Sequence, residues 1–145
     1  MGAGRVIGGL FALIGGILIL VAVIMYTDVF AYGIERQIIR WIVNLIVVIL
    51  AMVGGILAMA SKGGGGALTL FAGIIAFIMP LILSLAGYAS TDVGFWFYRL
   101  SGLEYITGWG TFTLQGSGII WHFAFEGFLI FLGSLLILNS RDEKY

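Results

Sequence analysis

Four long apolar stretches, separated by shorter polar or mixed segments, dominate the pattern of the chain. They run over residues 6–27, 38–60, 67–88 and 119–139. A helix of about 20 apolar residues crosses a hydrocarbon core of about 30 Å, and it satisfies its backbone hydrogen bonds internally, as lipid requires. The pattern predicts an all-α integral membrane protein, a four-helix bundle in which residues 1–145 form a single transmembrane domain. Residues 89–118 then form a long outer loop between the third and fourth spans.

The composition agrees with this prediction and removes other classes of protein. The chain is 61% hydrophobic and 10% charged, whereas soluble domains contain about 25% charged residues. Seven Lys and Arg residues balance seven Asp and Glu residues, so the charge gives no reason to expect a nucleic-acid partner. The chain has no Cys, which excludes disulfides, thiolate metal ligands and a Cys nucleophile.

The first span has a second interpretation, as a signal peptide, because Arg5 precedes it and Val29-Phe30-Ala31 resembles a cleavage site. Its apolar region exceeds the roughly 7 to 15 residues of a signal core, so we expect it to remain as a span. Four spans place both termini on one side of the membrane. That side carries more basic residues (Arg5, Lys62, Arg141, Lys144) than the other (Arg36, Arg40, Arg99). The positive-inside rule then predicts a multi-pass protein of the cell membrane with both termini in the cytoplasm.

The two halves of the chain resemble each other. Glycines recur in the same register in the first and third spans (Gly8, Gly9 and Gly16; Gly65, Gly66 and Gly73). The second and fourth spans end alike, with a glycine followed by Ser61-Lys62 or Ser140-Arg141, and Thr27-Asp28-Val29 recurs as Thr91-Asp92-Val93. Either the Gly-rich composition produces these matches by chance, or the bundle consists of two duplicated two-span hairpins. A duplication of two-span units places the repeat axis along the membrane normal.

A row of small residues marks the first span as a helix-packing surface. Gly4, Gly8, Ala12 and Gly16 are each four residues apart and form a continuous groove on one helix face. Small residues allow the backbone of another helix to approach closely in lipid, where burial of apolar area provides little driving force. The groove packs either on the other helices of the bundle or on a second protein chain.

The outer loop is rich in aromatic residues, among them Phe95, Trp96, Tyr98 and Trp109. Trp and Tyr prefer the headgroup layer, so we expect these four residues to form an outer platform that is either an interfacial anchor or a docking surface. The alternation in Thr111–Gln115, between turn-forming glycines, is a weak strand signal. It predicts a small hairpin with part of the first outer loop.

Four polar side chains interrupt the second and fourth spans: Arg40, Asn44, His122 and Glu126. Each pair has a spacing of four residues, which places its members on one helix face about 6 Å apart along the axis, near the outer end of the span. If the two faces meet, the four residues form one intramembrane cluster. This cluster either locks two helices together or forms a proton or cation site, because intramembrane ionisable residues are often functional. In the second case Glu126 carries the proton, with His122 as relay, Arg40 as counter-charge and Asn44 as neutral ligand.

No cofactor or enzymatic activity is expected. A bis-histidine haem needs two His, and the chain has one. The pair of His122 and Glu126 supplies only two of the three or four ligands of a zinc or di-iron site. The chain lacks Gly-x-Ser-x-Gly and His-Glu-x-x-His motifs, which would supply a hydrolytic nucleophile or base.

Two functions follow from these residues. The first is a non-enzymatic membrane protein in the lipid bilayer that acts by helix packing, as a homo-oligomer or as an accessory subunit of a larger membrane complex. The groove and the outer platform favour it. The second is a small oligomeric channel or proton-coupled transporter that uses the polar cluster near the outer face.

Overall fold

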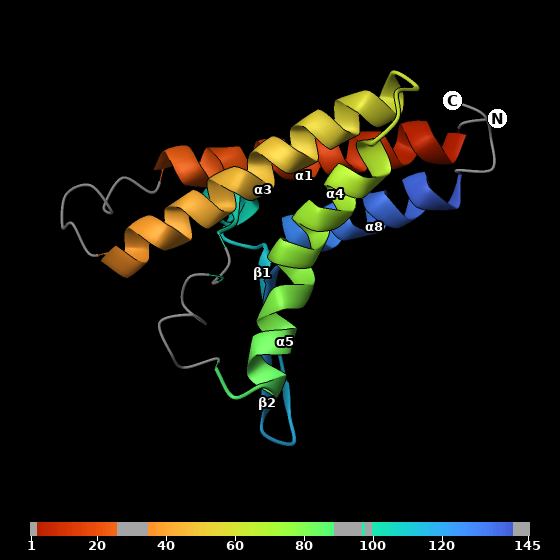
Figure 1. The fold of residues 1–145 in the computed structure, drawn as a ribbon. Helices are drawn as coiled ribbons and strands as arrows, with labels where there is room; N and C mark the ends of the chain where they lie inside the picture. The colour runs from red at the N-terminus through yellow and green to blue at the C-terminus, as the bar shows by residue number, and fades with distance from the viewer. Residues whose placement is uncertain (1–2, 26–34, 89–96, 98–99, 141–145) are drawn as a thin grey trace.

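The computed structural model describes residues 3–25, 35–88, 97 and 100–140. Within these residues three helices are long and apolar enough to cross a membrane (Figure 1). They are α1 (Ala3–Met25), α3 (Glu35–Met59), and a third helix built from α4 (Gly65–Gly73), η1 (Ile74–Ile78) and α5 (Met79–Leu85). At about 1.5 Å per residue, α1 is roughly 34 Å long, which matches the bilayer core. These helices indicate a membrane-embedded protein.

The third helix is irregular at its centre. In η1 the backbone forms a π-helix, and the Met79 N–H donates to the carbonyl of Ile74, five residues earlier. Pro80 has no N–H, so it cannot donate the α-helical bond to the carbonyl of Ala76. A Cβ added at Gly127 would lie 3.0 Å from this carbonyl oxygen. The absence of a side chain at Gly127 therefore allows another helix to approach the carbonyl that Pro80 leaves without an α-helical donor.

The prediction of a fourth helical span over 119–139 is wrong in its first part, and the fold is mostly helical rather than all-α. The helix α8 covers only Phe125–Asn139, while Ile119–Ala124 forms strand β2, paired antiparallel with β1 (Thr111–Gly116). The sequence Ile-Ile-Trp-His-Phe is β-branched and aromatic, which favours a strand. With 15 residues, α8 is roughly 22 Å long, shorter than a hydrocarbon core of about 30 Å.

The turn at Ser117 and Gly118 explains why β1 and β2 pair as a hairpin. Gly116 pairs with Ile119, which leaves Ser117 and Gly118 as a two-residue loop. Both have positive φ, +53° and +81°, as a type I′ turn requires. The strand predicted over Thr111–Gln115 is confirmed, but its predicted partner is wrong: β1 pairs with the segment directly after it instead of the first outer loop.

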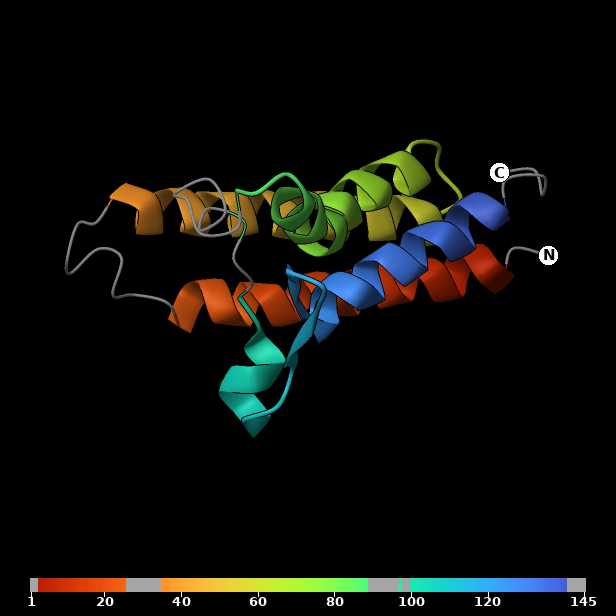
Figure 2. The same ribbon diagram turned by 90° about the horizontal axis from the view of Figure 1, so that it is seen from below.

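Four helices form a closed ring. The helix α1 packs against α3 and α8, and α4 also packs against α3 and α8. Figure 2 shows α1 and α3 side by side, with α8 next to α1. The core between them is made of small and branched side chains that exclude solvent: Ile19, Ala22, Val23, Val47, Val48, Ala51, Ala72 and Ile130. This ring provides the framework for the rest of the chain.

The glycines that match in the two halves of the sequence also make corresponding contacts. Gly133 of α8 lies against the carbonyl of Gly8 in α1, and Gly54 of α3 lies against the carbonyl of Gly65 in α4. Two turns further on the pattern continues: Gly16 contacts Met52 of α3, and Gly73 contacts Phe131 of α8. Positions 52 and 131 are each two residues before Gly54 and Gly133. At these glycines the α1–α8 contact therefore corresponds to the α4–α3 contact, and the α1–α3 contact corresponds to the α4–α8 contact.

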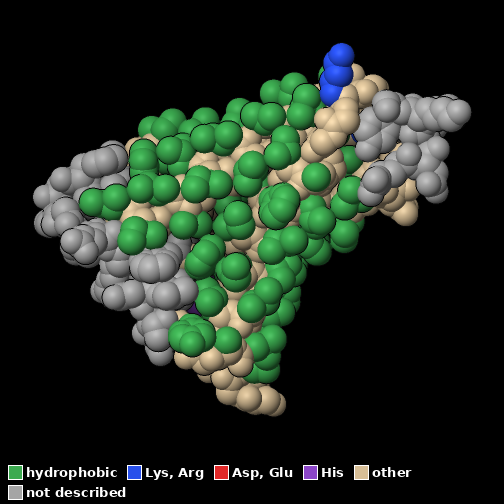
Figure 3. All heavy atoms as spheres, in the orientation of Figure 1, with side chains coloured by type: hydrophobic (Ala, Val, Ile, Leu, Met, Phe, Trp, Pro, Cys, Tyr) green, Lys and Arg blue, Asp and Glu red, His purple; other side chains and the backbone are tan. Residues whose placement is uncertain are grey.

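The two ends of the ring differ in character. At one end Gly4 contacts Ser140, and the Arg5 Nη2 donates to the Ser61 Oγ at 2.9 Å, so the start of α1, the end of α8 and the turn after α3 lie together. The exposed Lys62 lies in this turn. At the other end the hairpin packs along α5, where the Ile120 N–H donates to the Ser84 Oγ at 2.8 Å. Figure 3 shows hydrophobic side chains over most of the visible face, with basic atoms at the end that holds the turn.

Candidate functional site

Glu126 lies in the first turn of α8 and is 0% exposed. The expectation that it shares a helix face with His122 is wrong, because His122 belongs to strand β2. Side chains alternate between the two faces of a strand, so the four-residue helical spacing does not apply before Phe125. The environment of Glu126 comes instead from a segment 25 residues earlier.

The Glu126 carboxylate is held by α7 (Gly102–Thr107). The hydroxyl of Ser101 donates to Oε1 at 2.8 Å and to Oε2 at 3.0 Å, and the backbone N–H of Leu103 donates to Oε2 at 3.0 Å. Ser101 is also the N-cap of α7, where its Oγ accepts from the N–H of Glu104 at 3.1 Å. Hydrogen bonds to a charged acceptor are stronger than neutral ones. One carboxylate thus fixes the N-terminus of α7 on the start of α8.

This polar network lies deep in the bundle. A Cβ added at Gly15, in the middle of α1, would be 3.1 Å from the Glu126 carbonyl oxygen. A Cβ at Gly102 would overlap the carbonyl of Leu18, so α7 begins directly on the backbone of α1. Glu126 thus lies at the first turn of α8 and beside the middle of α1, and its position relative to the membrane surface stays a prediction. Leu100 and Ser101 have a non-helical backbone, and both are buried in protein.

The other three residues of the expected cluster have local bonds. The Asn44 Nδ2 donates to the carbonyl of Arg40 at 2.8 Å, one turn earlier in α3. The Nδ1 of His122 lies 2.9 Å from the Oγ1 of Thr113, its neighbour across the hairpin. Arg40 and Asn44 are both buried. The bonds described for Asn44 and His122 are therefore made to neighbours other than Glu126, and the four-residue cluster stays a prediction.

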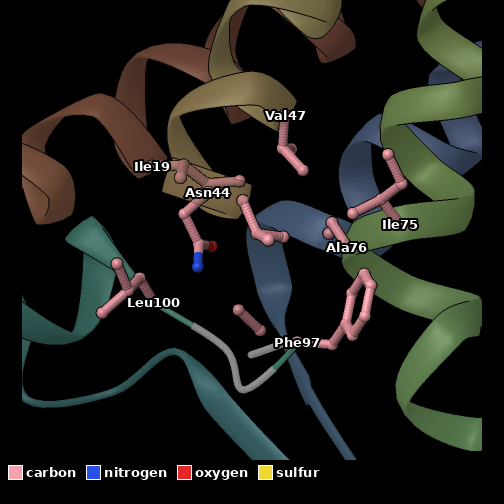
Figure 4. A pocket seen from close by; sticks show the side chains of 10 residues that line it. Ile19, Asn44, Val47, Ile75, Ala76, Phe97 and Leu100 are labelled. Carbon is pink, nitrogen blue, oxygen red and sulfur yellow. The ribbon is translucent and has the colours of Figure 1, made fainter. Parts of the chain in front are cut away.

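A small cavity lies beside Asn44, between α3, the third helix and the start of α8. Its lining includes Ile19, Asn44, Val47, Ala76, Leu100 and Gly127. Figure 4 shows the amide of Asn44 pointing into this space, opposite Ile75 and Ala76. The cavity volume available to a water-sized sphere is about 10 Å³, which is close to the minimum for one water molecule.

The small-residue groove of α1 faces other helices of the same chain. Gly4 contacts Ser140, Gly8 contacts Gly133 and Ile137, and Gly16 contacts Ala51 and Met52. Ala12 is completely buried. Because this surface is covered within the chain, it does not supply an interface to a second chain.

The outer platform is described only at one of its four residues. Phe95, Trp96 and Tyr98 lie outside the described residues. Trp109 is 58% exposed and packs edge to face on Phe112, with ring centroids 5.2 Å apart. It follows α7 directly and precedes β1, so it belongs to the unit formed by residues 100–124, which we call the α7–hairpin module.

Two features of the site were not anticipated from the sequence. Ser101 is the main partner of Glu126, and the signal for it is the capping-box sequence Ser101-Gly-Leu-Glu104. Phe77 is the centre of an aromatic cluster that joins η1 to the hairpin and α8, with ring centroids 4.7 Å from Trp121, 5.0 Å from Phe123 and 5.5 Å from Phe131. The Trp121 Nε1 also donates to the Phe77 carbonyl at 2.8 Å. These contacts fix the hairpin on the third helix.

Among the described residues, no group of three or more His, Asp or Glu side chains is arranged to hold a metal ion. Comparison of the chain with protein-family models, with curated proteins and with solved structures found no match. The functional argument therefore depends on the geometry described above.

Proposed function

We propose that the protein is a non-enzymatic, multi-pass membrane subunit whose helices hold the α7–hairpin module in one position for packing against another membrane chain. The observation that carries this proposal is that the fully buried Glu126 binds the start of α7. Burying a carboxylate costs several kcal/mol unless its oxygens accept hydrogen bonds. The Glu126 carboxylate accepts hydrogen bonds from the Ser101 hydroxyl and the Leu103 N–H, at the start of α7. The acid acts as a clamp on α7.

The module offers a surface that fits this role. Four of its large hydrophobic side chains are about half exposed or more: Tyr105, Ile106, Trp109 and Leu114. Aromatic residues of this kind are enriched at protein interfaces and at the membrane boundary. Since the groove of α1 is covered within the chain, the module is the better candidate for contact with a partner, either a second copy or a different membrane protein.

We also propose that the protein resides in the cell membrane with both termini in the cytoplasm. Arg5 and Lys62 lie at the end of the ring where α1 starts and α8 finishes. Basic residues next to span ends favour the cytoplasmic side. This orientation places the hairpin at the outer end.

We further propose that the two helix pairs arose by duplication. The support is that the Gly8–Gly133 contact corresponds to the Gly65–Gly54 contact. Chance sequence matches in a Gly-rich chain give no reason to expect corresponding contacts. The repeat is then a parallel one, and its two units close the ring.

The packing role is tested by the mass of the protein extracted from its own membrane into native lipid discs. We expect a particle containing more than one 15.6 kDa chain. Leu114→Ala and Ile106→Ala, at exposed positions of the module, should reduce the mass toward a single chain without lowering thermal stability. Leu135→Ala, at a half-exposed position of α8, is the matched control and should leave the mass unchanged. A single chain per disc in the wild type would contradict the proposal.

The alternative, a small oligomeric channel or proton-coupled transporter, is favoured by one observation, the cavity at Asn44 close to the buried Glu126. A pathway needs ionisable groups that water reaches. The test is flux of protons or cations into liposomes containing the purified protein. Flux that is abolished by Glu126→Gln in a folded protein would favour this alternative over the packing role.

A further inference from the structure

Asn44 is a buried polar side chain that uses only part of its hydrogen-bonding capacity. It is 7% exposed, and among the described residues its amide makes one hydrogen bond, from Nδ2 to the carbonyl of Arg40. An Asn amide can donate two hydrogen bonds and accept two. The Oδ1 and the second N–H of Asn44 therefore have no partner in the described part of the chain, and the amide points into the cavity (Figure 4).

Two further residues, one from the third helix and one from α8, line the same cavity. Ala76 lines it, and its carbonyl has no α-helical donor because residue 80 is proline. Gly127 also lines it, in the first turn of α8. The first N–H groups of a helix have no partner within the helix, and here the N–H of Phe125 is satisfied by the carbonyl of Gly110 at 2.7 Å. The Asn44 amide, Ala76 and Gly127 thus line one cavity.

The size and charge of the cavity select the ligand. A volume of about 10 Å³ admits one water-sized particle. An anion would be repelled by the carboxylate of Glu126 in the same turn of α8, and a cation by the positive end of the helix dipole and by Arg40 one turn from Asn44. A water molecule is neutral, both donates and accepts, and binds where it finds two to four polar partners.

We propose that this cavity is a binding site for a single internal water molecule, held between the Asn44 amide, the backbone around Ala76 and the first turn of α8. The water completes the hydrogen bonding of Asn44 inside a membrane-embedded core, where an unsatisfied polar group costs about 1–3 kcal/mol. It also links α3 to the junction of the hairpin and α8, at the point where the fourth span changes from strand to helix.

The test is nuclear magnetic resonance of the ¹⁵N-labelled full chain in lipid nanodiscs, with magnetisation transfer from water to amide protons. In the wild type we expect a cross-peak from a long-lived water to the Gly127 N–H and to the side-chain amide of Asn44. In Asn44→Leu, which fills the cavity with an apolar group, the peak at Gly127 should disappear. Ile46→Leu, at a half-exposed position of the same helix, is the control and should retain it.

A second variant keeps the proposal testable if Asn44→Leu does not fold. Asn44→Ser retains a polar group and enlarges the cavity, so the water contact at Gly127 should persist. The proposal is overturned if the wild type shows no water contact at Gly127 while the exposed turn at Gly63 does, or if Asn44→Leu leaves that contact unchanged in a folded protein.

Discussion

Replacement of Glu126 by leucine should separate α7 from the bundle. The substitution keeps a side chain of similar size in the first turn of α8 and removes both acceptor oxygens. Ser101 and the N–H of Leu103 then lose their bonds at 2.8 to 3.0 Å. Ser101 is buried and the adjoining Gly102 lies on the backbone of α1, so water does not simply replace the acceptor that Ser101 loses.

The expected loss of stability can be worked from these bonds. Two donors, one hydroxyl and one N–H, serve the carboxylate, and a hydrogen bond to a charged group contributes about 1.5–3 kcal/mol. Their sum is roughly 3–6 kcal/mol, and these contributions already include the cost of desolvation. We expect Glu126→Leu to lower the free energy of unfolding by about 3–6 kcal/mol. Glu126→Gln keeps one acceptor oxygen and should lose about half as much.

The assay is denaturant unfolding in bicelles together with hydrogen exchange of the α7 amides. Exchange at residues 102–107 should accelerate in Glu126→Leu before the rest of the bundle opens. Glu104→Gln is the matched control, because Glu104 is exposed and accepts only from the Thr111 hydroxyl among the bonds described. It should change stability by about 0.5 kcal/mol or less. If Glu126→Leu unfolds like the wild type and α7 keeps its protection, Glu126 is not the clamp.

Three other substitutions test the packing, the turn and the orientation. Gly8→Ala places a methyl group on the carbonyl of Gly133 and should destabilise the protein by about 1–3 kcal/mol in the unfolding assay. Gly63→Ala, with open space around it, is the control and should have no effect. Equal stability of the two variants would contradict the close α1–α8 contact. Gly118→Ala keeps the φ of +81° at a cost of about 1–2 kcal/mol and should weaken the strand band in the infrared spectrum, and an unchanged band would argue against the type I′ turn. Single cysteines at Lys62 and Glu104, in a chain that has no Cys, should react with a membrane-impermeant reagent from the inside and the outside respectively, and the reverse labelling would invert the orientation.

The long helices were predictable from the sequence because each shows one uninterrupted apolar run. For α1 and α3 the expected limits 6–27 and 38–60 agree closely with Ala3–Met25 and Glu35–Met59. The prediction of the fourth span was wrong at its start for a physical reason. Hydropathy does not distinguish a strand of large apolar residues from an apolar helix. The distinguishing signal was local, in the Ser117-Gly118 turn and the β-branched residues after it.

The site was harder to predict because its bonds join segments that are distant in sequence. The buried acid and the buried Asn44 could be identified as unusual from their position in apolar spans. Their partners could not be predicted. Helical periodicity placed Glu126 on the same helix face as His122, whereas in the structure the Glu126 carboxylate accepts a hydrogen bond from Ser101. A capping-box sequence indicates that Ser101 begins a helix, but it does not indicate which carboxylate reaches its hydroxyl.

The shortness of α8 has a consequence for how the chain is made in the cell. A mostly apolar helix of 15 residues that carries an acid in its first turn is too short to partition into a bilayer by hydropathy alone, since insertion needs about 20 apolar residues. Its place depends on surfaces that α1 and α4 provide, through Gly8, Gly15 and Gly73. We therefore predict that α8 integrates into the membrane only after the first three helices have assembled. Residues 119–145 fused alone behind a translocation reporter should fail to integrate, whereas the same segment behind residues 1–118 should be retained.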